Sequence, residues 1–113
     1  MIVMGNNISM IRGDSESLTI SMETNEGFDE YFKDGDIVYF TVKETIATDK
    51  KILQKIITSF VDGKAIIEIL PTDTQDLRVK DYVYDIQLTK GDESVTTIVK
   101  PSKFSLLGDV TRE

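Results

Sequence analysis

The segment 81–107 constrains the fold more than any other part of the chain, because two strands and the turn between them can be read from it directly. Its first half alternates polar residues with apolar or aromatic ones, at Tyr82, Tyr84, Ile86 and Leu88. A two-residue period places successive side chains on opposite faces, which predicts a strand with one buried face. Residues 90–93 (KGDE) supply a glycine-containing reversal, and alternation resumes over 94–100. The segment therefore predicts two strands joined by a tight turn.

The earlier half of the chain repeats this style of short strands and polar turns. Ile8 and Met10 share one face of 7–12, and 16–22 alternates with Leu18, Ile20 and Met22 directed inward. Residues 37–43 (IVYFTVK) are nearly continuous in β-branched and aromatic residues. Such a run predicts a central strand buried on both sides.

Residues 50–61 are predicted to form a further strand, with one face carrying Ile52, Gln54, Ile56, Thr58 and Phe60. A helix over 48–55 competes with this interpretation, because the isoleucines and leucine there also fit helical spacing. The β-branched residues and the turn that follows favour the strand. Asp62-Gly63 is a strong two-residue hairpin signal and predicts a hairpin leading into a strand over 65–70.

Residues 71–80 interrupt the strand pattern and predict one short helical turn, capped by Thr72 or Asp73, with Leu77 packed into the core. A tyrosine soon after such a turn can form a corner that hydrogen-bonds to nearby backbone. Pro101 cannot donate to a strand ladder, so its strand must be an edge there, or bend and change partner. Residues 108–113 are typical of a frayed or linker-like tail.

Together these features predict an all-β, immunoglobulin-like β-sandwich of seven or eight antiparallel strands with one short helical turn. An OB-type barrel is the structural alternative, but it uses fewer, longer strands and usually a basic face. The 113 residues are of single-domain length, so we assign 1–113 to one domain with a core over about 7–108.

Composition excludes several kinds of chemistry. The chain has no histidine and no cysteine, which removes Ser-His-Asp and Cys-His catalysis, histidine or thiolate metal sites, and disulfides. Its net charge of −7 would repel nucleic acid. The first 36 residues hold most of this charge, and a basic partner is the alternative to simple solvation there. No segment approaches the roughly 20 apolar residues of a membrane span. The apolar opening 1–4 is far shorter than a signal-peptide core, so secretion is not expected.

Two loop motifs are candidate binding sites. Residues 12–15 spell the integrin-recognition tetrapeptide Arg-Gly-Asp-Ser, but Gly-Asp-Ser is also ordinary turn chemistry, and we interpret it as a turn. The acidic loop 23–36 could supply oxygen ligands to calcium, although its spacing does not fit a calcium-loop pattern, and solvation is the preferred interpretation. Its acids are Glu23, Glu26, Asp29, Glu30, Asp34 and Asp36.

A carboxylate pair and a set of aromatic residues are further candidates, for catalysis and for stacking on a ligand. Glu68 and Asp85 are a conceivable pair for glycoside hydrolysis, but alternation places each on a polar face. We interpret one aromatic set as core rather than as a stacking platform: Tyr39, Phe40, Phe60, Tyr82, Tyr84 and Phe104. We assign no catalytic, cofactor-binding or metal-ligating residue, and no cofactor; the chain is expected not to be an enzyme.

Several segments resemble the immunoglobulin-like modules of phage and prophage structural proteins. They are IRGDSESLTISM, DGDIVYFTVK, DGKAIIEILPTDTQDL, YVYDIQLT and VTTIVKPSKFSL. The closest resemblance is to the N-terminal domain of upper baseplate proteins from phages of Gram-positive bacteria, over roughly 7–108. Those proteins continue into helical and fibre regions that this sequence lacks, so a fibre-holding role is not expected.

The resemblance implies a virion component, made in the bacterial cytoplasm, that acts in a tail, baseplate or head fibre. Its role would be assembly or host-surface attachment, with other tail or baseplate subunits as partners. Homo-oligomerisation is left open, and no nucleic acid, membrane or small-molecule partner is expected. The alternative is a carbohydrate-binding module that presents Phe28, Tyr31 and Phe32 to cell-wall glycan. Exposure of those aromatic side chains would favour it.

Overall fold

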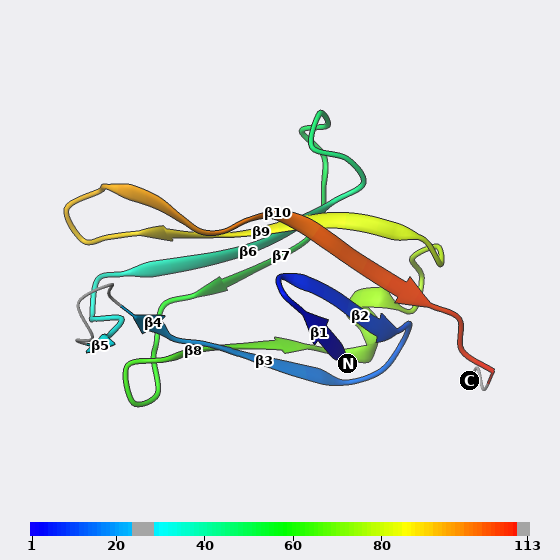
Figure 1. Ribbon diagram of the computed structural model, residues 1–113, viewed down its shortest axis with the longest axis horizontal. Coiled ribbons are helices and arrows are strands. Elements are labelled where there is room, and N and C mark those ends of the chain that lie inside the picture. Colours follow the sequence, from blue (N-terminus) through cyan, green and yellow to red (C-terminus); the bar gives the residue numbers. More distant parts are fainter. Residues whose placement is uncertain (24–28, 111–113) are drawn as a thin grey trace.

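Two layers of β-strands make up the computed structural model, which describes residues 1–23 and 29–110 (Figure 1). The larger layer is a six-stranded sheet in the order β1 (Ile2–Met4), β2 (Asn7–Ile11), β10 (Val95–Leu107), β9 (Asp81–Thr89), β6 (Ile37–Lys43) and β7 (Lys51–Ile57). The smaller layer pairs β3 (Glu16–Ile20) with β8 (Ala65–Ile69). A short pair joins β4 (Met22–Glu23) to β5 (Asp29–Glu30), and α1 (Pro71–Thr74) is one helical turn.

The alternating residues of β9 lie as the sequence predicts, and they form the centre of the core. Tyr82, Tyr84, Ile86 and Leu88 are all buried, and the residues between them are half-buried. Strand β6 alternates in the same way, with only Val38, Phe40 and Val42 fully buried. The prediction that this strand is buried on both sides is therefore wrong, because the polar side chains of its other face remain partly open to solvent.

The two β-layers confirm the predicted all-β, sandwich-like fold class. Strands β10, β9, β6 and β7 adjoin in one sheet, β3 and β8 form the other, and the helical turn precedes β9. The described residues form ten strands rather than seven or eight. The excess comes from β1, β4 and β5, which are too short to show alternation clearly in the sequence.

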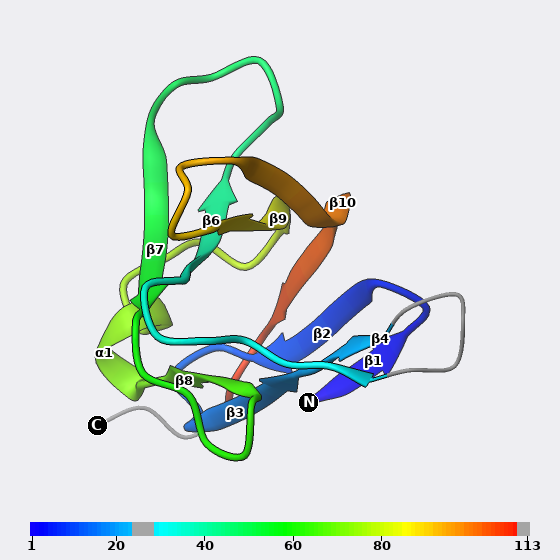
Figure 2. The same ribbon diagram turned by 90° about the vertical axis from the view of Figure 1, so that its left-hand side faces the viewer.

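One pair of strands is parallel, so the expectation of an entirely antiparallel fold is wrong at that point. Residues 104–107 of β10 lie beside 8–11 of β2 in the same direction. A parallel pair needs a long connection, and here nearly the whole domain supplies it. The sheet twists so far that its β1–β2 end lies close to β3 (Figure 2), and the Met1 amine is 2.6 Å from the Glu16 carboxylate.

Pro101 has the effect that the sequence predicts. The register between β10 and β9 shifts between Thr97 and Val99 and again between Val99 and Ser102. Beyond these irregularities β10 acquires β2 as a second neighbour. The strand thus bends where its proline cannot donate a hydrogen bond, and it gains a partner after the bend.

The turn at Asp62 and Gly63 is confirmed, but the hairpin predicted around it is not. Both residues have positive φ, 51° and 73°, and the only pairing at the turn is an isolated bridge from Val61 to Lys64. Strand β7 pairs with β6, whereas β8 pairs with β3. The turn therefore carries the chain from one sheet to the other. The competing helix over 48–55 is also wrong, because most of that segment is β7.

The helical turn lies where expected, although its cap is different. The residue before the helix is Leu70, whose backbone N–H donates to the Asp73 carboxylate at 2.7 Å. The predicted tyrosine corner is present, because the Tyr82 hydroxyl donates to the carbonyl of Arg78 at 2.7 Å. Leu77 is half-buried and packs against the core. This corner fixes the start of β9 relative to the helical turn.

Candidate interaction surface

The interior of the sandwich is used for packing. Among the described residues, no buried side-chain nitrogen or oxygen lacks a hydrogen-bond partner, and no three acidic side chains come close enough to hold a metal ion. The buried hydroxyl of Thr74 accepts from the backbone N–H of Gly13 at 2.8 Å. That of Ser105 donates to the Asp81 carboxylate at 2.7 Å. These buried hydroxyls join the turn after β2 to α1, and β10 to β9.

The structure does not bring Glu68 and Asp85 together. Glu68 lies on β8, in the smaller sheet, and Asp85 lies on β9, in the larger one. Each alternates with buried neighbours, so the two side chains point away from the shared core in opposite directions. This carboxylate pair cannot act on one substrate.

The Arg-Gly-Asp-Ser motif is a turn, as predicted, and its arginine is engaged within the molecule. Gly13 has φ of 85°, which favours glycine. The Arg12 guanidinium donates to one carboxylate oxygen of Asp109 at 3.0 and 3.1 Å, and to the carbonyl of Leu77 at 3.1 Å. The expectation of a frayed tail from 108 onward is thus wrong at Asp109, which is held by a charge-assisted contact. Residues 111–113 lie outside the described part of the chain.

Most of the aromatic set is core, as predicted. Phe40, Tyr84 and Phe104 contact one another with ring centroids 5.3 to 6.3 Å apart. Tyr82 is buried as well, whereas Tyr39 and Phe60 are half-buried.

The aromatic platform suggested for glycan binding is incomplete. Phe32 is only 4% exposed and stacks on Phe60 at 5.1 Å, while Tyr31 is 53% exposed. Phe32 therefore closes one end of the core instead of facing a ligand, which counts against the glycan-binding alternative. Phe28 lies outside the described residues.

The acidic loop can be judged only in part. Glu26 and the side chains of Glu23, Asp29 and Glu30 lie outside what the structure describes. Asp34 is exposed, and the Asp36 carboxylate accepts from the backbone N–H of Lys33 at 3.0 Å. That contact gives Asp36 a structural role in the turn before β6. For the rest of the loop, solvation stays the preferred interpretation and calcium binding stays the alternative.

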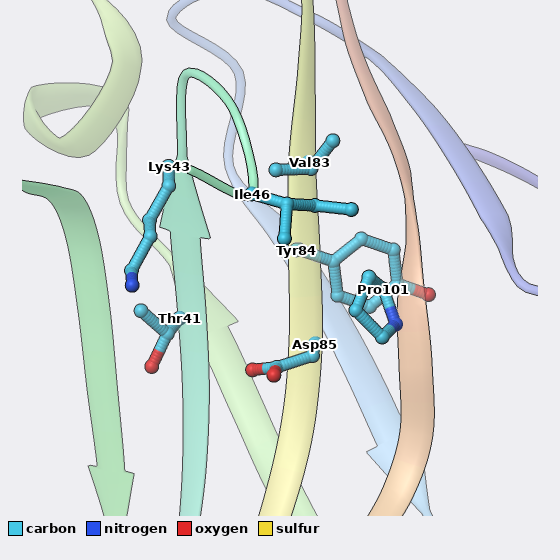
Figure 3. A pocket seen from close by; sticks show the side chains of 7 residues that line it. All are labelled: Thr41, Lys43, Ile46, Val83, Tyr84, Asp85 and Pro101. Carbon is cyan, nitrogen blue, oxygen red and sulfur yellow. The ribbon is translucent and has the colours of Figure 1, made fainter. Parts of the chain in front are cut away.

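A shallow groove of about 180 Å³ lies on the larger sheet beside the bend of β10 (Figure 3). It brings one ammonium and one carboxylate to a partly apolar surface; its lining is Thr41, Lys43, Ile46, Val83, Tyr84, Asp85 and Pro101. The Tyr84 hydroxyl donates to the carbonyl of Asn6 in the β1–β2 turn. In this groove Thr41 and Asp85 lie opposite each other in the β6–β9 register.

The two edges of the larger sheet differ in their side chains. The β7 edge carries Lys51 and Lys55, of which Lys55 also reaches the Asp73 carboxylate at 2.7 Å. Lysine on an edge strand opposes pairing with another chain. Strand β1 is uncharged, and its three side chains are exposed: Ile2 63%, Val3 47% and Met4 74%.

We define the N-terminal edge as the three residues of β1, Ile2, Val3 and Met4. Ile11 on β2 and Leu107 on β10 are also exposed and lie opposite each other, but β2 separates Leu107 from β1. Sequence reasoning treated 1–4 only as a segment too short for a signal peptide and missed its role as a strand. Gly5-Asn6 between two short apolar runs was the available hairpin signal. An uncharged, unpaired edge with exposed apolar side chains is the candidate interaction surface of this molecule.

Stability is expected to fall as the pH rises above about 10, because burial raises the pKa of Tyr84 above its ordinary value of 10.0. Burial, and then the Glu44 carboxylate, also raise the pKa of Tyr82. In this range the unfolded chain loses phenolic protons that the folded chain keeps, so the free energy of unfolding decreases with pH. Below pH 10 both tyrosines are protonated in the folded and the unfolded chain, so their contribution to the free energy of unfolding is fully present. Urea melts from pH 8 to about 11 should show a shallower decline for Tyr84→Phe than for the parent; equal slopes would contradict the assignment.

No family model, curated protein or solved structure matches the chain. Within the described ranges, none of the helical structure has the length and apolar character needed to cross a bilayer.

Proposed function

We propose that this chain is a non-enzymatic structural module of a phage or prophage virion, a tail, baseplate or head-fibre component. It mediates protein–protein assembly or host-surface attachment, and it is made in the bacterial cytoplasm before it enters the particle. The observation that carries the proposal is the N-terminal edge, where Ile2, Val3 and Met4 are exposed on a strand with one free side. Exposed, unguarded strand edges add strands from other chains.

The rest of the molecule supports an assembly role. Its buried hydroxyls at Thr74 and Ser105 hold the scaffold together, and the arginine of the Arg-Gly-Asp-Ser turn is bound to Asp109. The groove beside Pro101 is small, about 180 Å³. The resemblance of five segments to phage immunoglobulin-like modules gives the assembly role its setting. Attachment to other virion subunits would use the exposed N-terminal edge.

Co-purification tests this proposal. The tagged chain is expressed together with the tail and baseplate proteins encoded beside it, and at least one of them is expected to be retained with it. An immunoglobulin-type domain of similar net charge is the control for non-specific capture. If none of the neighbouring proteins is retained, and the chain also fails to bind the bacterial surface, the proposal is contradicted.

A further inference from the structure

We propose that two copies of this chain associate through β1, which pairs antiparallel with β1 of the second copy and joins the two larger sheets into one. This inference deepens the proposed function, on which it rests for its biological role, by naming the partner of the N-terminal edge.

The backbone of Val3 is directed toward the free side of β1. A two-residue turn, with Gly5 at φ of 60°, closes the hairpin and places Met4 opposite Asn7 and Ile2 opposite Ser9. In a two-residue hairpin the closing pair is hydrogen-bonded, and hydrogen-bonded pairs then alternate along the ladder. Val3, opposite Ile8, is therefore in a non-hydrogen-bonded pair. Its N–H and C=O point away from β2 and are open to another strand.

A second copy completes this edge with twofold symmetry. When β1 pairs antiparallel with itself about Val3, the two Val3 residues exchange both backbone hydrogen bonds. Ile2 of each copy then lies opposite Met4 of the other, on the same face of the joined sheet. Both side chains are exposed in the single chain, so this contact buries apolar surface. In the part of the chain that the structure describes, no strand has to leave this edge for the pairing to form.

Charge distribution favours this site over the others for self-association. The whole chain carries a net charge of −7, so copies repel each other over most of their surfaces. Residues 1–11 contain no charged side chain, and the Met1 amine is paired with Glu16 at 2.6 Å. The opposite edge of the sheet carries Lys51 and Lys55. The N-terminal edge is thus a place where two like-charged copies meet without opposing side-chain charges.

The small size of β1 sets the strength that we expect. A strand of three residues buries less than the roughly 800 Å² per partner of a standard interface. Ile11 and Leu107 lie on β2 and β10, on the other side of β1, and add nothing to this contact. We therefore expect a reversible dimer with a Kd on the order of micromolar.

Sedimentation velocity across about 1 to 500 µM protein tests the proposal. The parent is expected to shift from monomer to dimer with concentration. Val3→Pro removes the edge-directed N–H without touching a β1–β2 hydrogen bond, and it should weaken the dimer at least about tenfold. Val3→Thr keeps that N–H and should still dimerise. Circular dichroism and urea melts establish that each variant is folded.

A charged pair of variants separates this edge from other exposed apolar sites. Met4→Lys places an ammonium on the edge and should also weaken the dimer at least about tenfold. Ile46→Lys is the matched control, because Ile46 is 70% exposed, close to the 74% of Met4, but lies in the β6–β7 loop. The control should dimerise like the parent.

The outcomes distinguish this inference from the proposed function. A parent that stays monomeric throughout, or a dimer unaffected by Val3→Pro and Met4→Lys, overturns the inference. A monomeric parent that binds a neighbouring tail protein through Met4 overturns it too, while the assembly role stands. A Val3-dependent dimer that retains no tail protein supports the inference and counts against the virion role.

Discussion

Ile86→Ala is expected to lower the free energy of unfolding by about 2–5 kcal/mol. Ile86 is 0% exposed at the middle of β9, where it lies opposite Phe40 on β6 and Val99 on β10. Truncation removes buried apolar contacts and leaves a cavity that two flanking strands prevent from collapsing. Urea melts at neutral pH, with equal m-values required for the two proteins, measure the loss.

The adjacent residue supplies the control. Asp85 is half-buried and faces the outer side of the same strand, so Asp85→Ala is expected to change stability by no more than about 0.5 kcal/mol. Because successive side chains of a strand alternate between faces, the two variants read out the register of β9. Equal losses would mean that the assigned register is wrong.

Phe104→Ala is expected to cost about 3–5 kcal/mol. Phe104 is 0% exposed and lies just beyond the bend of β10, opposite Tyr82 on β9 and Ile8 on β2. Its ring packs edge-on against Phe40 and Tyr84, at 6.1 and 6.3 Å between centroids. The substitution therefore removes the ring at the junction of three strands. Thermal and urea unfolding should both record the loss.

Lys103→Ala is the matched control for this variant. The Lys103 side chain is largely exposed, and its ammonium lies 3.7 Å from the Asp81 carboxylate, a surface contact worth little. Its backbone N–H donates to the Asn7 side chain at 3.0 Å, which alanine preserves. A change within about 0.5 kcal/mol is expected. A loss as large as that of Phe104→Ala would show that the backbone of β10, rather than the aromatic ring, determines stability here.

Alternation in the sequence predicted the strands well, because a strand with one buried face has an apolar side chain at every second position. Tyr82 to Leu88 and Ile8 with Met10 all lie as expected. Pairing partners were harder to predict, since a turn such as Asp62-Gly63 reports only local backbone geometry. After that turn the chain enters the smaller sheet, and the residues from Val61 to Lys64 do not indicate which sheet the next strand joins.

The interaction surface was missed for a related reason. Whether an apolar strand is an edge depends on the order of all the strands, which local patterns do not contain. Residues 2–4 offer three positions, too few for alternation to separate a strand from an apolar terminus. The parallel contact between β2 and β10 joins residues about ninety-six positions apart, as Phe104 and Ile8 show. Only the folded arrangement shows that, among the described residues, β1 has a neighbouring strand on one side and none on the other.

The pairing of β2 with β10 has a consequence for synthesis. Residues 8–11 are translated ninety-six positions before the neighbour that covers them, 104–107. In that interval the newly made β1–β2 hairpin has two unoccupied sides instead of one, for several seconds at ordinary elongation rates of about 5–20 residues per second. The nascent hairpin is therefore most prone to mispair before β10 emerges.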